Sequence, residues 1–227
     1  MEHDLRIVSY NLREHLAVNE LLDLVDAHEI DVLCLQECDS TDIPETIRGL
    51  RLAESTKTNR LGLALYYRED RFDLVETKLF SLMKSMHDRV MAPAHERLLT
   101  ARLNDRQNGR EIVVSSFHAA PLTASNSLRR KQIASAHEKI HELAPGVPSV
   151  MVGDFNYPWF TASLKKRLQK SGYELSITEE PTYLRYKYFH GHFDFVTSIN
   201  MQIGSLLSLP QGKSDHRPIL LLATVGA

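Results

Sequence analysis

Carboxylates, carboxamides and histidines stand at the ends of several apolar segments of this sequence. The clearest case is Val150–Asn156, where an apolar run ends in Gly153 and is followed by Asp154 and Asn156. Alternate residues of an extended strand share one face, so the carboxylate and the carboxamide point together if the strand continues to its end. An ordinary turn is the alternative, because Gly, Asp and Asn are all turn formers.

The same residue types recur at other predicted strand ends and in the adjacent loops. These further candidates are Asn11, Glu37, His118, Asp194, Asp215 and His216. Buried carboxylates are costly unless they are paired or bound to a metal, so such a cluster implies a compensating cation. Ligation by oxygen, without cysteine and with little histidine, favours Mg²⁺ or Mn²⁺ over Zn²⁺. A hard ion with histidines nearby can support hydrolysis at phosphorus.

The first part of the chain predicts two strands joined by a helix. Leu5–Asn11 alternates apolar and polar residues, Leu16–His28 has apolar residues at helical spacing, and Asp31–Glu37 is apolar until its end. A strand, a helix and a strand over this length predict a right-handed parallel crossover. Asn11 and Glu37 are then at the same end of neighbouring strands, where open α/β sheets bind ligands.

The middle of the chain is richer in strands. Four apolar and β-branched segments predict an antiparallel meander: Leu61–Tyr67, Phe72–Phe80, Arg97–Leu103 and Glu111–Phe117. Between them, Met83–His95 has no clear periodicity and is expected to be a loop, either over the site or in solvent. A helix at Ser127–Leu143 and the strand ending in Asp154 repeat the strand-helix-strand order, and Ile219–Val225 predicts a final strand.

Composition limits the class of protein. The 227 residues are 43% hydrophobic and 25% charged, and no linker divides them, so we expect one domain over residues 1–227. The acidic start lacks the features of a signal peptide and no apolar run could span a bilayer, which predicts a cytoplasmic protein without membrane insertion. A net charge of −2 gives no global basic field, so any anion-binding surface must be local.

In chain order, these motifs resemble those of the endonuclease/exonuclease/phosphatase superfamily, which includes deoxyribonuclease I-like and AP-endonuclease-like proteins. The resemblance spans nearly the whole chain and is carried by Ser9–Leu12, Leu35–Glu37, Phe117–Pro121, Gly153–Asn156, Phe193–Phe195 and Ser214–Pro218. It implies an α/β fold, a four-layer α-β-β-α sandwich with two packed mixed sheets. The site is then expected at one edge of both sheets.

The resemblance also implies roles at the metal and at the attacking water. Glu37 resembles the principal metal carboxylate, with Asn11 beside it, and Asp215 would add a carboxylate to the metal region. Asp154 would hold or activate the water. Asn156 would orient that water or the phosphate.

The two histidines have related implied roles. His216 resembles the base or phosphate-contacting histidine, and Asp194 would hydrogen-bond to it and fix its tautomer. His118 resembles a donor to the phosphate oxygens. Deoxyribonuclease I-like members carry a carboxylate partner for this histidine near the strand that corresponds to Arg60–Tyr67, where this sequence has none. The partner of His118 and the choice of acid and base therefore stay open.

The implied function is a divalent-metal-dependent phosphoester hydrolase. The favoured form is a phosphodiesterase or nuclease that acts on DNA or RNA. The alternatives are hydrolysis of small phosphate esters or lipid and inositol headgroups, and a binding protein with an inactive site. Arg129 could belong to a local anion-binding rim and Trp159 could stack on a base, although packed or solvated roles are alternatives for both.

Overall fold

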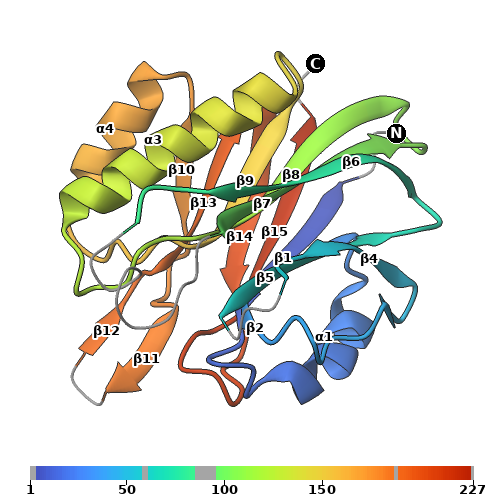
Figure 1. Ribbon diagram of the computed structural model, residues 1–227, viewed down its shortest axis with the longest axis horizontal. Helices are drawn as coiled ribbons and strands as arrows, with labels where there is room; N and C mark the ends of the chain where they lie inside the picture. The colour runs from blue at the N-terminus through green and yellow to red at the C-terminus, as the bar shows by residue number, and fades with distance from the viewer. Residues whose placement is uncertain (1–3, 58–60, 85–95, 187–188, 226–227) are drawn as a thin grey trace.

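The computed structural model describes residues 4–57, 61–84, 96–186 and 189–225 (Figure 1). Most of the predicted loop, residues 85–95, lies outside this part of the chain.

Two sheets make up the body of the molecule. The seven-stranded sheet has the order β14 (Met201–Ser208), β15 (Ile219–Val225), β1 (Leu5–Asn11), β2 (Val32–Cys38), β5 (Gly62–Arg68), β4 (Leu50–Ser55) and β3 (Thr46–Ile47). The six-stranded sheet has the order β10 (Glu174–Ile177), β13 (Asp194–Ile199), β9 (Ser149–Asp154), β8 (Arg110–His118), β7 (Glu96–Asp105) and β6 (Phe72–Ser81).

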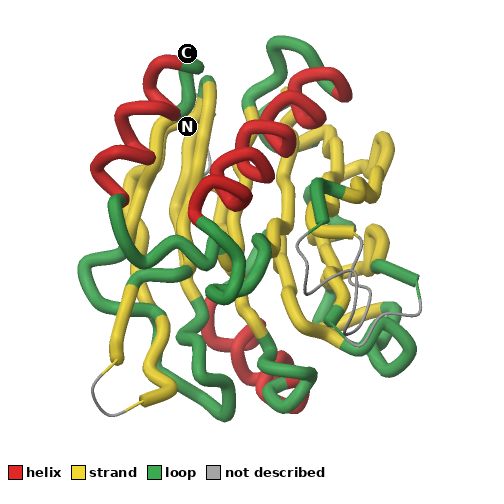
Figure 2. The backbone as a smooth tube through the Cα atoms, turned by 60° about the vertical axis from the view of Figure 1, so that its left-hand side comes forward, coloured by secondary structure: helices red, strands yellow, loops and turns green. Residues whose placement is uncertain are grey.

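Helices cover the outer faces of both sheets (Figures 1 and 2). On the seven-stranded sheet, a 3₁₀ turn at Val18–Glu20 leads into α1 (Leu21–His28). On the six-stranded sheet lie α3 (Asn126–Leu143) and α4 (Thr161–Lys170). A separate hairpin of β11 (Tyr183–Tyr186) and β12 (Phe189–Gly191) extends from the end of the molecule.

Three apolar cores separate the four layers. The central core fills the space between the sheets with side chains such as Ile7, Val114 and Val152, each fully buried. Ile133 of α3 belongs to the core on the six-stranded sheet, and Leu21 of α1 belongs to the core on the seven-stranded sheet. The predicted α-β-β-α sandwich with two packed mixed sheets is confirmed.

The details of strand order differ from the expected meander. β6, β7 and β8 are consecutive antiparallel neighbours, but the segment at Leu61–Tyr67 forms β5, which pairs with β2 in the other sheet. Apolar runs that are buried on both faces have no pattern that assigns them to one sheet or the other. The parallel pairing of β1 with β2, and of β8 with β9, follows the prediction.

His137 of α3 is buried where the helix meets the six-stranded sheet. Its ring stacks on Tyr173 with centroids 3.7 Å apart, and its Nε2 forms a 2.9 Å hydrogen bond with Thr197 Oγ1. Burial lowers the pKa of His137 to about 3. In the unfolded chain His137 has a pKa near 6.5. The contribution of neutral His137 to the free energy of unfolding is therefore complete above about pH 6.5, and it is lost as the pH falls toward the lower pKa of the folded protein.

We therefore expect acidification to destabilise the protein through His137. Between about pH 7.5 and about pH 5 the loss from this residue is about 2 kcal/mol. Urea unfolding at the two pH values measures it, with His137→Gln as the comparison. The variant is expected to lose about 2 kcal/mol less than the parent over the same interval. Equal losses in both proteins would rule out His137 as the source.

No helix in the described ranges is long and apolar enough to cross a membrane. The cytoplasmic localisation stays a prediction.

Candidate active site

Strand register brings the predicted site residues to one edge of the two sheets. His118 at the end of β8 pairs with Asp154 at the end of the parallel β9, and Asp154 pairs with Asp194 at the start of the antiparallel β13. In the other sheet, β1 ends at Asn11, and the parallel β2 carries Glu37 near its end. Residues up to 183 positions apart in sequence thus meet at one end of the sandwich, because parallel strands end there and antiparallel strands begin there.

Asp154 lies at the centre of this group. Its Oδ2 accepts hydrogen bonds from Asn11 Nδ2 and Asn156 Nδ2, each at 3.1 Å, and its Oδ1 accepts one from the Asn156 backbone N–H at 2.9 Å. The predicted meeting of Asp154 and Asn156 occurs, but the reason given for it was wrong. β9 ends at Asp154 and Asn156 has a φ of +48°, so a tight turn rather than strand alternation joins the two side chains.

Glu37 reaches the site from a bulge in β2. It has a φ of +53°, and the pairing with β5 shifts register between Gln36 and Cys38. A left-handed conformation at a residue other than glycine costs about 1–3 kcal/mol and is concentrated at functional sites. The bulge turns the carboxylate so that Oε1 accepts from Asn11 Nδ2 at 3.3 Å and Oε2 accepts from the Glu14 backbone N–H at 3.0 Å.

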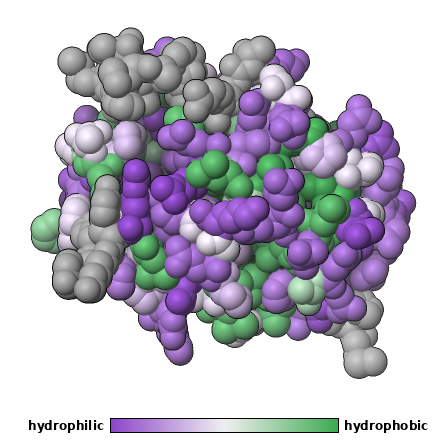
Figure 3. All heavy atoms as spheres, turned by 90° about the horizontal axis from the view of Figure 1, so that it is seen from below, coloured by the Kyte–Doolittle hydropathy of each residue, from purple (hydrophilic) through white to green (hydrophobic). Residues whose placement is uncertain are grey.

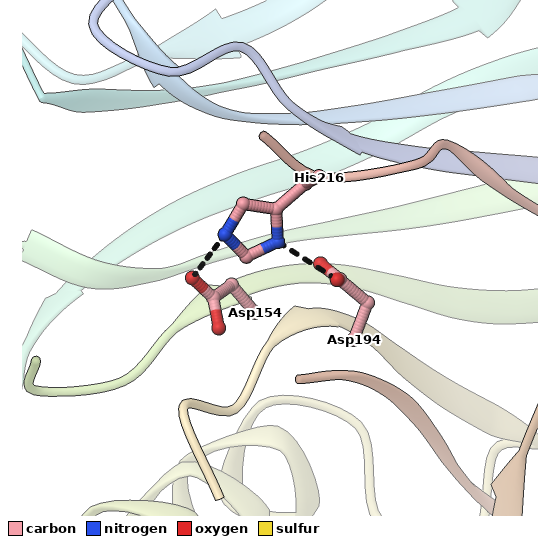
Figure 4. Close-up of side chains that lie close together, drawn as sticks. All are labelled: Asp154, Asp194 and His216. Carbon is pink, nitrogen blue, oxygen red and sulfur yellow. Dashed lines mark hydrogen bonds and ion pairs between the residues drawn. The ribbon is translucent and has the colours of Figure 1, made fainter. Parts of the chain in front are cut away.

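His216 stands between two carboxylates (Figure 4). Its Nδ1 is 2.8 Å from Asp194 Oδ2, and its Nε2 is 3.7 Å from Asp154 Oδ2. The hydrogen bond between Asp194 and His216 that the resemblance implied is present. Aromatic edges of Tyr183 and Phe193 flank the imidazole and fix its plane.

The charges of this trio are coupled. Burial alone would lower the pKa of His216, but the carboxylates of Asp194 and Asp154 raise the pKa well above its ordinary value. Burial raises the pKa of Asp154, and the charge of Asp194 adds to the increase, while His216 opposes it. At neutral pH His216 is therefore an imidazolium, and Asp154 is a stronger base than an exposed aspartate.

His118 faces the carboxylates from the other side of Asp154. Its Nε2 is 3.7 Å from Glu37 Oε1 and 3.7 Å from Asp154 Oδ2. The sequence had left the carboxylate partner of His118 open, and these two side chains from opposite sheets are close enough to serve.

The donor set decides where a divalent cation fits. Asp154, Asp194 and His216 have atoms within 4.8 Å of one another. Nδ1 of His216 is already engaged by Asp194 at 2.8 Å and its Nε2 faces Asp154 at 3.7 Å, so the trio has the arrangement of a hydrogen-bonded chain. Glu37 and Asp154 both accept hydrogen bonds from Asn11 Nδ2. These three residues offer oxygen ligands without cysteine, which is the chemistry of a site for a hard ion.

Asp215 has a different environment from the other carboxylates. Its Oδ2 lies 3.8 Å from Arg13 Nε and 3.7 Å from Arg185 Nε, and its side chain is 8% exposed. The two arginines are about half exposed. Asp215 thus precedes His216 in the chain but directs its oxygen to two guanidinium groups.

Arg129 and Trp159 differ in accessibility. Arg129 is 2% exposed, and its guanidinium donates to the Pro121 carbonyl at 2.7 Å and to Asn126 Oδ1. Burial lowers its pKa. These contacts hold the loop before α3 and leave Arg129 almost no exposed surface, and its substrate-binding role stays a prediction. Trp159 is 49% exposed, as a stacking role requires.

Ser214 and Gln36 are two residues next to the site that were not predicted. Ser214 Oγ donates to the Asn11 carbonyl at 2.6 Å and accepts from the His216 backbone N–H at 3.0 Å, so it joins the last loop to the first strand. Gln36 is fully buried and donates to Ser116 Oγ across the sheet interface at 2.9 Å. A glutamine at the polar end of an otherwise apolar strand was the available signal for this contact.

Arg97 supports the backbone of the histidine strand. Its Nη1 donates to the His118 carbonyl at 3.0 Å and to the Ala119 carbonyl at 2.9 Å. Its side chain is buried, so the charge faces carbonyl oxygens of β8 rather than solvent. Nothing in the sequence distinguished this arginine from the exposed ones.

Figure 3 shows the end of the molecule where the site lies, with hydrophilic residues over most of that face and hydrophobic residues between them. A sandwich of this architecture with carboxylates, amides and histidines at its edge defines a class of hydrolases that act on phosphate esters. The chain belongs to the Endonuclease/Exonuclease/phosphatase family, whose profile matches residues 8–215. The predicted resemblance is confirmed.

Individual relatives are distant. Over 162 residues the chain is 24% identical to Protein angel of Drosophila melanogaster, a match that covers 66% of this chain and 44% of the relative. This chain therefore aligns with less than half of that protein. ANGEL2, described as a 2′,3′-cyclic phosphatase, has a similar structure with a TM-score of 0.75, 16% identity, and coverage of 98% of this chain and 96% of that one. TDP2 of D. rerio, complexed with a single-strand DNA product, also has a similar structure. Its TM-score is 0.78 and its sequence identity is 14%, with coverage of 98% of this chain and 100% of that one.

Proposed function

We propose that this protein hydrolyses phosphodiesters with the help of a divalent cation, Mg²⁺ or Mn²⁺, and that nucleic acid is its first candidate substrate. The observation that carries the proposal is the convergence of His118 and His216 on one carboxylate, Asp154, with Glu37 from the other sheet next to the same His118 nitrogen. The relatives support the choice of substrate, since ANGEL2 and TDP2 are described with a nucleotide vanadate and a DNA product.

In this proposal Asp154 accepts a proton from the attacking water. Its raised pKa brings it nearer to the operating pH, which is where a general base is most effective. Asn11 and Asn156 fix the orientation of the carboxylate by hydrogen bonds to its Oδ2.

The histidines act on the phosphate. His216 is charged and contributes a fixed positive group next to the base, and Asp194 prevents its ring from turning. His118 supplies a second N–H donor on the opposite side. A cation held by Glu37 and Asn11, with Asp154 nearby, would neutralise phosphate oxygens and ease departure of the leaving oxygen. The predicted role of Asp215 as a metal residue stays a proposal beside its contacts with Arg13 and Arg185.

A metal requirement tests the proposal directly. EDTA is expected to abolish hydrolysis of a phosphodiester, and added Mg²⁺ or Mn²⁺ is expected to restore it. Glu37→Gln should raise the Mg²⁺ concentration for half-maximal activity by about tenfold or more, because an amide replaces the charged ligand. Glu14→Gln removes the same charge from the adjoining loop and serves as the control. An unchanged Mg²⁺ titration of the Glu37 variant would withdraw the ligand assignment.

A second candidate substrate class follows from the two arginines beside Asp215. Arg13 and Arg185 have side chains 40% and 49% exposed, so their guanidinium groups are accessible to a terminal phosphate, which carries more charge than an internal diester. Small phosphate monoesters and lipid or inositol headgroups are such substrates. A panel of monoesters and diesters with Mg²⁺ and Mn²⁺, with Asp154→Asn as the inactive control, separates the two classes.

A further inference from the structure

A cleft of about 900 Å³ separates α3 from α4 on the outer face of the six-stranded sheet. The two helices lie side by side in Figures 1 and 2. The cleft runs along α3 from Arg130 to His141, a helical distance of about 16 Å. Its charged lining consists of Arg130, Glu138, Lys166, Arg167 and Lys170, and His137, His141 and Tyr173 are its further titratable residues.

The rim of the α3/α4 cleft is locally basic although the whole chain has a net charge of −2. Glu138 is the carboxylate of the lining, against four arginine and lysine side chains. In the part of the chain that the structure describes, Lys166, Arg167 and Lys170 have no carboxylate within salt-bridge distance. Their charges are therefore available to an anionic ligand.

Four large apolar side chains on the floor of the cleft are almost completely buried. Ile133, Leu164, Leu168 and Tyr173 are only 1%, 2%, 5% and 7% exposed. These four side chains would therefore add little apolar area to a complex with an amphipathic helix. The charged groups of the cleft are mostly positive, which suits a chain of phosphates.

The cleft begins next to the active site. Arg130 lines the cleft and donates from Nη1 to the hydroxyl group of Tyr157 at 3.0 Å. Tyr157 directly follows Asn156 in the loop that leaves the site. In the same loop Trp159 and Phe160 are 49% and 72% exposed, and α4 starts at the next residue. Exposed aromatic rings between a hydrolytic site and a basic cleft provide stacking surfaces for bases.

We propose that the α3/α4 cleft binds the sugar-phosphate backbone of a single-stranded polynucleotide whose reacting phosphate lies in the active site. The proposal rests on the phosphodiesterase function proposed above and extends it, because it predicts a preference for substrates long enough to reach from the site past Trp159 to Lys170. Affinity then depends on the phosphate chain rather than on base sequence.

The experiment compares two double variants with equal charge changes on the same two elements. Lys166→Glu with Lys170→Glu alters the cleft, whereas Lys131→Glu with Lys165→Glu alters exposed lysines of α3 and α4 that do not line it. Binding of a fluorescent oligothymidylate of about 20 nucleotides is measured by anisotropy against salt concentration, in an Asp154→Asn background that prevents turnover.

We expect the cleft variant to bind about tenfold more weakly than the control variant. Its plot of log affinity against log salt should be less steep by about 1.4, since each phosphate contact with a single strand contributes about 0.7. With Asp154 restored, the ratio of kcat/KM on the oligonucleotide to kcat/KM on a dinucleotide should fall by the same factor.

Other outcomes overturn the proposal in distinguishable ways. Equal affinities and slopes for the two double variants would exclude the cleft as a polynucleotide site, whatever the catalytic activity. Binding of polyglutamate at the cleft, with no binding of the oligonucleotide, would assign the surface to an acidic protein instead. If wild-type protein with Mg²⁺ or Mn²⁺ hydrolyses neither the dinucleotide nor the oligonucleotide, the proposed function itself fails, independently of the binding result.

Discussion

Replacing His216 with alanine is expected to lower kcat by about 10²–10⁴-fold while the protein remains folded. The imidazolium is the one positive group between Asp194 and Asp154, at 2.8 Å and 3.7 Å from their oxygens. Its loss removes a fixed charge from the phosphate position and leaves two buried carboxylates without their shared partner. Asp154→Asn should lower kcat by a factor of the same order, because an amide cannot accept the proton of the attacking water.

Turnover of a chromogenic phosphodiester with Mg²⁺, together with circular dichroism of the same samples, measures this effect. His28→Ala, in α1 on the opposite side of the seven-stranded sheet, is the matched control and should keep full activity. A folded His216→Ala protein with unchanged kcat would mean that this histidine takes no part in the reaction.

Gly153→Ala adds a single methyl group next to the site and is expected to destabilise the folded protein strongly. A Cβ at this position would lie 1.9 Å from the Phe117 carbonyl oxygen, and the φ of +145° is strained for any other residue. The neighbouring atoms are backbone atoms of β8, so the clash can be relieved only by separating two paired strands. We expect a loss of about 3 kcal/mol or more in the free energy of unfolding, or failure to fold.

Gly109→Ala separates conformational strain from this clash. Gly109 also has a positive φ, of +63°, but a Cβ there would meet nothing within 4 Å. Its substitution should cost about 1 kcal/mol. Urea unfolding of both variants provides the comparison, and similar losses for the two would show that the approach of Phe117 is not responsible.

The sequence indicated which polar residues gather at this edge more reliably than it indicated the contacts between them. Polar residues at the ends of apolar strands stand out because an interior strand position would bury them at a cost, and Glu37, Asp154 and His118 were found this way. Their neighbours across the sheets depend on strand order, which hydrophobic periodicity does not encode. The segment now seen as β5 was accordingly expected in a meander with β6, although it pairs with β2.

Burial of individual arginines was the least predictable feature. Arg129 and Arg97 carry the same charge as Arg13, yet the first two are almost completely buried against backbone carbonyls and the third is half exposed beside Asp215. A side chain that is apolar along its stem and charged at its tip can satisfy either environment. Only the arrangement of the loops around it decides which one it meets.

The position of β15 between β14 and β1 has a consequence for synthesis of the protein on the ribosome. β1 is made first, but one of its edges stays unpaired until Ile219–Val225 has been translated. The imidazole of His216 arrives only just before that strand. In the mechanism proposed above, a nascent polypeptide therefore has an incomplete site until the residues just before β15 have been translated.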